Sequence, residues 1–185
     1  EEIARVASPP AVQGRGRDGT RLLLVQGTLD WQRERFRKHI RAARIAKKPL
    51  IIHAATPKAR PSTFSRPNTR ATRASSCTAF AVPSMKRRAV DLGGHVSFTG
   101  NLTFKRNDAL REVARSVPLT RLLLETDCPY MAPVPFRGKR AEPLHVEWLA
   151  RLHAELHDTD AETAASVTTE NAVRLFDLPR TLLGE

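Results

Sequence analysis

A short apolar run followed directly by two carboxylates is the feature that most constrains this chain. Leu122–Leu124 suits a buried strand, and Pro129 ends any continued pairing soon afterwards. Glu125 and Asp127 therefore fall at the carboxyl end of a strand. In parallel α/β folds this end carries the chemistry, because its loops vary while the strand fixes side-chain direction. Asp127 is accordingly a candidate metal ligand or general base; the alternative is a carboxylate that only caps the next turn.

Helical and extended patterns alternate along the chain, and this alternation predicts a parallel sheet in an α/β fold. Strands are expected at 50–52, 95–98 and 121–124. Helices are expected at 31–47, 85–92, 109–116 and 143–157, followed by a short helix capped by Asp160 and a last helix at 170–176 capped by Thr169.

The length of 185 residues suits one domain with a hydrophobic core, so we expect a single domain over 1–185. No apolar run approaches the roughly 20 residues that span a bilayer. The two cysteines show no metal-site or disulfide spacing. We therefore expect a cytoplasmic protein that needs neither a membrane nor an obligate protein partner. Because the chain starts at Glu1 without Met, we also expect it to be a fragment.

Basic residues are concentrated in a segment without any acid. Fifteen lysines and arginines, and no carboxylate, lie between Arg35 and Val90 within a chain of net charge +12. Such a charge suits a surface that binds nucleic acid. Residues 58–73, however, have no helical or strand periodicity and have the composition of a basic linker.

Four segments resemble the TatD family of metal-dependent DNases, a family of the amidohydrolase-like TIM barrel superfamily. The run from Leu123 to Pro143 resembles the family pattern L-L-E-T-D-x-P-Y-L-A-P-x-P-x-R-G-x-x-N-x-P. The other segments are 49–54, similar to a strand that ends in a ligand His, 94–100, similar to I-S-F-S-G, and 168–176, similar to T-x-E-N-x-x-x-L-F. They occur in the family's order, and the match covers roughly 29–53 and 85–178.

The resemblance implies an incomplete TIM (β/α)8 barrel. A complete barrel needs about 250 residues, so this chain would be the C-terminal two-thirds, truncated at its N-terminus. Irregular segments are expected near 14–27 and 55–84, where the family pattern is interrupted.

The resemblance also implies hydrolysis of DNA phosphodiester bonds, from a strand end, by two divalent metal ions (Mg²⁺, Mn²⁺ or Zn²⁺). His53 and Asp127 match two of the family's metal ligands, and we expect them to project from neighbouring strands toward one cation pocket. Glu125 is expected to support the ligands without binding the metal itself. No further catalytic residue is assigned.

Three cations follow Asp127 in a proline-rich loop. Arg137, Lys139 and Arg140 are candidates for phosphate contacts because they would flank the mouth of the site. The alternative is a solvated loop.

Other reactive side chains are expected to be structural. His153 and His157 have the spacing of a metal pair, but they lie on a predicted outer helix without a nearby acid, which favours a solvated face. His95 opens a strand, so a surface or structural role is expected. Cys128 is expected to be a small buried side chain.

Family motifs return in the two interrupted segments when codons are chosen and read one base later. Residues 14–27 then permit V-G-E-T-G-L-D-Y-Y, residues 55–58 permit R-D-A-K, and residues 74–80 permit R-V-I-L-H-C-F. We hypothesise that 14–27 and 55–84 are frameshifted, which would explain the acid-free basic middle; a true basic linker is the alternative.

Several family ligands are missing on this hypothesis. The H-x-H motif would precede Glu1, the G-E glutamate is replaced within 14–19, and the H-C-F histidine is lost around Cys77. We therefore expect the chain as written to be inactive. Two other functions are kept open: a metal-dependent amidohydrolase that acts on a small substrate, and a non-enzymatic basic protein that binds nucleic acid.

Overall fold

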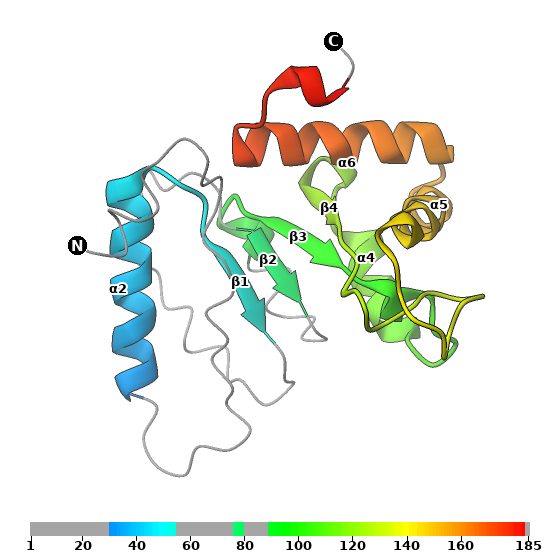
Figure 1. Cartoon of the computed structure of the whole chain (residues 1–185), viewed down its shortest axis with the longest axis horizontal. Helices are drawn as coiled ribbons and strands as arrows, with labels where there is room; N and C mark the ends of the chain where they lie inside the picture. Colours follow the sequence, from blue (N-terminus) through cyan, green and yellow to red (C-terminus); the bar gives the residue numbers. More distant parts are fainter. Residues whose placement is uncertain (1–29, 55–75, 80–88, 184–185) are drawn as a thin grey trace.

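The protein contains a parallel sheet whose strands follow one another in sequence order. The computed structural model describes residues 30–54, 76–79 and 89–183. The strands are β1 (Ile51–Ala54), β2 (Ser76–Ala79), β3 (His95–Phe98) and β4 (Leu122–Leu124), hydrogen-bonded in the order β1-β2-β3-β4 (Figure 1). The predicted parallel sheet and three of its strands are confirmed. The fourth, β2, lies inside the segment 55–84 that was predicted to be irregular, so that prediction was wrong for Ser76–Ala79.

Helices lie at both ends of the sheet. The α-helices with described bounds are α2 (Asp30–Ala46), α4 (Asp108–Ser116), α5 (Val146–Leu156) and α6 (Ala161–Phe176). Residues 89–91, within the predicted helix 85–92, are also helical. Short 3-10 helices are η3 (Gly100–Thr103), η4 (Leu119–Arg121), η5 (Pro143–His145) and η6 (Arg180–Leu183). Figure 1 shows α2 beside β1, whereas α5 and α6 lie at the β4 end.

The hydrophobic core joins β3 and β4 to the helices that follow them. Val96, Phe98 and Leu122 are fully buried, and Leu149 of α5 is 1% exposed. All four belong to one cluster of buried side chains that also includes Ala114 of α4. Burial of a side chain of this size contributes about 1.5–3 kcal/mol, so this cluster fixes the positions of the loops that leave β3 and β4.

The last helix is continuous, whereas the sequence predicted two helices divided at Thr169. Asp160 caps the helix as predicted, because its carboxylate accepts a hydrogen bond from the Thr163 N–H at 2.7 Å. Thr169, the predicted cap, lies inside this helix, and the hydroxyl of its neighbour Thr168 donates to the Ala164 carbonyl one turn earlier at 2.7 Å. A threonine whose hydroxyl is satisfied within the helix is compatible with a helix interior.

Asn171 fastens α6 to the start of β4. Its side-chain amide donates to the carbonyls of Leu119 and Leu122, both at 2.9 Å, and the residue is 2% exposed. These carbonyls belong to η4 and β4, so one amide holds the strand that leads to Asp127 against the helix. A buried carbonyl that loses its hydrogen-bond donor lowers the stability of the folded protein.

Replacing Asn171 by Ala should destabilise the protein by about 1–3 kcal/mol, because two buried carbonyls lose their shared donor. Urea unfolding followed by circular dichroism measures the change. Ser166→Ala, at an exposed position of the same helix, is the matched control and should leave the midpoint nearly unchanged. Equal effects of the two substitutions would contradict the anchoring role of Asn171.

The described histidines include three buried ones, His95, His145 and His153, and the half-buried His157. His153 is fully buried, with its ring centre 5.4 Å from that of Phe98 and 6.1 Å from that of His157. The predicted solvated face was wrong for His153, because α5 packs against α6, α4 and β4 at once and its histidine side faces the core. His95 is 8% exposed, which rules out the surface role and leaves the structural one.

Burial is the main cause that lowers the pKa of His95 and His157. Arg121 and Arg174 lower the pKa of His95 further. For His157, a hydrogen bond to the Ala114 backbone opposes the effect of burial without reversing it. Both rings therefore bind a proton less readily in the folded protein than in the unfolded chain.

Acidification should destabilise the protein through these two rings. A histidine whose folded pKa is lowered contributes its full stability above its unfolded pKa of about 6.5 and loses it as the pH falls below that value. The urea midpoint should therefore drop between pH 7.5 and pH 5.5, and His157→Gln should reduce the drop. A midpoint that rises on acidification, or a drop unchanged by His157→Gln, would contradict this account.

Candidate functional site

The carboxyl ends of all four strands meet at one edge of the sheet, because every neighbouring pair is parallel. Two loops leave this edge at the β4 end. The β3–α4 loop comprises residues 99–107, and the β4–α5 loop comprises residues 125–145. The second loop contains the predicted site residues that follow β4, and the two loops together form the described part of the candidate site.

Asp127 lies in a tight turn just beyond β4. Its backbone carbonyl accepts a hydrogen bond from the Tyr130 N–H at 2.7 Å, and the side chains of Asp127 and Glu125 are half-buried. Cys128 in this turn is exposed, and its thiol donates to the Thr126 hydroxyl at 3.0 Å. The prediction of a buried Cys128 was therefore wrong, because the turn projects from the strand end.

His53 lies near the carboxyl end of β1, as predicted, with a side chain outside the described part of the structure. It does not come from a strand next to that of Asp127. Its register partner is Thr78 of β2, whose partner in β3 is Ser97. Two strands thus separate β1 from β4, which corrects the expected neighbouring positions while leaving both residues at the same edge.

The described residues do not fit a pair of divalent ions. Among them, no group of three His, Cys, Asp or Glu residues lies together in a way that could hold a metal. At the level of His53, the neighbouring strands carry Thr78 and Ser97, which are not ionisable ligands. A two-metal centre needs several His and carboxylate ligands from different strand ends.

The β4–α5 loop has a fixed shape. The Ala141 N–H donates to the Pro129 carbonyl at 3.0 Å and closes the loop at its base. Phe136 stacks on His145 with ring centres 4.4 Å apart and meets the edge of Trp148 at 5.6 Å. The loop's middle therefore rests on the start of α5.

The three predicted phosphate-contact residues all lie on this loop. Arg137, Lys139 and Arg140 are exposed at the edge that carries Asp127. The structure thus brings them to the same end of the sheet as the carboxylates.

The two loops pack closely against each other. A side chain at Gly100 could not be accommodated, because a Cβ there would lie 1.9 Å from the Met131 carbonyl oxygen. The Val134 N–H donates to the Thr103 hydroxyl at 2.8 Å and joins the loops a second time. The β3–α4 loop therefore positions the β4–α5 loop.

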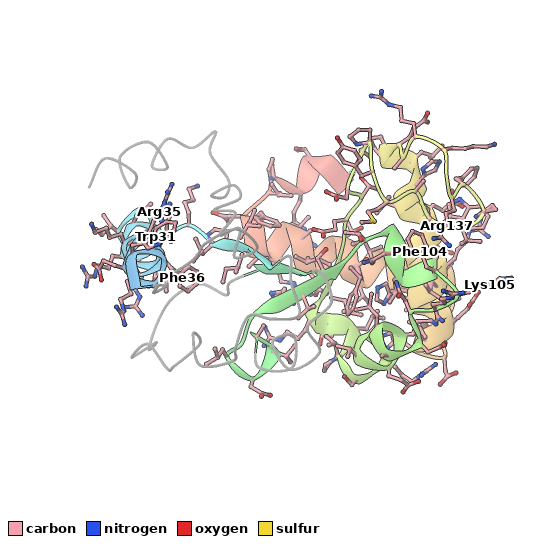
Figure 2. All side chains as sticks on the ribbon, turned by 90° about the horizontal axis from the view of Figure 1, so that it is seen from below. Trp31, Arg35, Phe36, Phe104, Lys105 and Arg137 are labelled. Atoms are coloured by element: carbon pink, nitrogen blue, oxygen red, sulfur yellow. The ribbon has the colours of Figure 1, made fainter. Side chains whose placement is uncertain are left out.

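Phe104 is a site residue that sequence reasoning missed. The guanidinium carbon of Arg137 lies 4.6 Å from the centre of the Phe104 ring, and Figure 2 shows the two side chains together with Lys105. The backbone carbonyl of Phe104 accepts a hydrogen bond from Arg111 at 2.8 Å. An aromatic residue beside a lysine in a polar loop after a strand was the available signal.

None of the described helices is long and apolar enough to cross a membrane.

The chain matches known proteins along most of its length. Residues 15–177 match the model of the family described as TatD related DNase. The chain is 37% identical over 183 residues to the uncharacterized metal-dependent hydrolase YcfH of Escherichia coli K12, covering 96% of this chain and 68% of the relative. It is 34% identical over 187 residues to the uncharacterized metal-dependent hydrolase TatD of Mycobacterium tuberculosis, covering 96% of this chain and 69% of that protein.

The solved structures agree with the fold. The crystal structure of YJJV, a TatD homologue from Escherichia coli K12, superposes with a TM-score of 0.67 at 22% identity, covering 84% of this chain and 61% of that one. This likeness confirms the predicted α/β fold of the TIM-barrel type. The chain spans about two-thirds of the length of these proteins. From the family match and the identity to full-length relatives, this chain belongs to the TatD related DNase family of metal-dependent hydrolases.

Proposed function

We propose that this protein is a frame-disrupted member of the TatD family whose intact form hydrolyses DNA phosphodiester bonds, from a strand end, with two divalent metal ions. The observation that carries the proposal is the family match over residues 15–177. It is supported by the place of Asp127, which follows a buried parallel strand at the edge where such folds hold their chemistry.

The proposed metal ligands come from the two outer strands of the sheet, and the proposed phosphate contacts come from the β4–α5 loop. His53 on β1 and Asp127 after β4 would be metal ligands, and Glu125 would orient the ligand set without binding a metal. Arg137 and its cationic neighbours Lys139 and Arg140 would contact phosphates, because exposed cations on a fixed loop can position a polyanion.

We further propose that the chain as written does not hydrolyse DNA, because the family's G-E glutamate is replaced within 14–19 and its H-C-F histidine is missing around Cys77. The strand register supports the frameshift explanation. When 74–80 are read as R-V-I-L-H-C-F, the histidine takes position 78, and residue 78 is the register partner of His53 in the sheet. The shifted reading therefore places a histidine, which can bind a metal, on the strand next to the predicted ligand His53.

The decisive comparison is between the chain as written and a reframed chain in which 14–27 and 55–84 carry the alternative reading. With Mg²⁺, Mn²⁺ or Zn²⁺, the reframed chain should release nucleotides from an end-labelled DNA strand, and the chain as written should not. Asp127→Asn in the reframed chain should lower the rate of DNA hydrolysis. The reduction should exceed the about 10–100-fold loss that follows removal of a group that only supports a metal ligand.

Strong metal-dependent hydrolysis by the chain as written would contradict the proposed loss of ligands. Cleavage of a small amide substrate, with DNA left intact by the reframed chain, would contradict the DNA reaction and favour an amidohydrolase. DNA binding without hydrolysis by the reframed chain, unaffected by His53→Ala and Asp127→Ala, would favour a non-enzymatic binding protein.

A further inference from the structure

We propose that Arg137 and Phe104 form a stacking platform that takes one unpaired nucleobase at the end of the bound DNA strand. This inference rests on the proposed DNA substrate and adds a base-binding position to the phosphate contacts. The platform lies where the β3–α4 and β4–α5 loops meet (Figure 2). Both loops leave the carboxyl edge of the sheet, where Asp127 follows β4.

The geometry of the pair suits stacking. The guanidinium group of Arg137 lies over the Phe104 ring, with its central carbon 4.6 Å from the ring centre. Arg137 is exposed and Phe104 is half-buried. The guanidinium therefore covers the ring, and because Arg137 is exposed, its far side is available to a second flat group. Nucleobases stack on both aromatic rings and arginine planes, largely without regard to sequence.

The platform is held in place from both sides. Arg111 donates to the Leu102 carbonyl at 2.9 Å and to the Phe104 carbonyl at 2.8 Å, which fixes the backbone beneath the ring. The Thr103–Val134 hydrogen bond joins the loop of Phe104 to the loop of Arg137. A surface that is already ordered loses little conformational entropy when it binds a ligand.

The charge around the platform is complementary to a single DNA strand. The five exposed cations of the two loops are Lys105, Arg106, Arg137, Lys139 and Arg140. Within the described part of the chain, none of them forms an ion pair with a carboxylate. In contrast, exposed arginines on the neighbouring helices do, as in Arg115 with Glu112 and Arg151 with Glu147. Unpaired cations therefore gather where a phosphate backbone would have to run for a base to reach Arg137.

The test separates stacking from phosphate contacts. The full chain is titrated, without added metal and at fixed low salt, against a fluorescently labelled single-stranded oligonucleotide and against an abasic oligonucleotide with the same number of phosphates. Fluorescence anisotropy reports both affinities. The chain should bind the base-bearing strand about fivefold or more tightly, the factor that one stacked base supplies.

Two variants should remove that preference. Arg137→Lys keeps the charge and loses the plane, and Phe104→Leu removes the ring. Each should weaken binding of the base-bearing strand by about fivefold or more beyond any weakening of the abasic strand. Phe104→Trp should retain the preference. Lys139→Gln should weaken binding of both strands by the same factor. Arg115→Lys, a matched change on α4, should change neither affinity. Thermal unfolding of each variant verifies that it is folded.

Equal affinity of the chain for both strands, or an equal loss for both in Arg137→Lys, would overturn the platform. A chain that binds neither strand would overturn it as well. Failure of the reframed chain to hydrolyse DNA, with base-selective binding intact, would contradict the proposed reaction and support the platform. The two proposals can thus fail separately.

Discussion

The parallel pairing of β3 with β4 is the constraint on which the described site depends. Val96 pairs with Leu122 and Phe98 with Leu124, and this register sends the two following loops away from the same edge of the sheet. The buried cluster around β3 and β4 fixes the strands, and Asn171 holds the start of β4 against α6. The apolar packing around β3 and β4 therefore sets the positions of the two loops and of the side chains that they carry.

The strand before Asp127 could be predicted because its signal is local. A short run of leucines followed by carboxylates and a proline is sufficient to indicate a buried strand that ends at a potential site. The strand β2 has no comparable signal: Ser76–Ala79 is short and weakly apolar, and it is a strand because β1 and β3 pair with it on either side. The local sequence of β2 therefore does not predict that it pairs with β1 and β3.

Several site features could not be predicted because they depend on contacts between distant segments. His153 is buried since α5 packs against elements on more than one side, which the spacing of polar residues along one helix does not reveal. The Phe104–Arg137 contact joins two different loops. In contrast, the exposed cations after Asp127 and the place of His53 near a strand end were predictable from residue type and strand pattern.

We propose that His53 and Asp127 serve one metal centre at the carboxyl edge of the sheet, although two strands separate them. Anomalous diffraction from crystals of the reframed protein containing Zn²⁺ tests it most directly. We expect zinc within about 2.0–2.2 Å of a nitrogen of His53 and of an oxygen of Asp127, on one ion or on two neighbouring ions of the same centre. A zinc centre formed by other residues, or one that contacts only one of these two side chains, would contradict the claim.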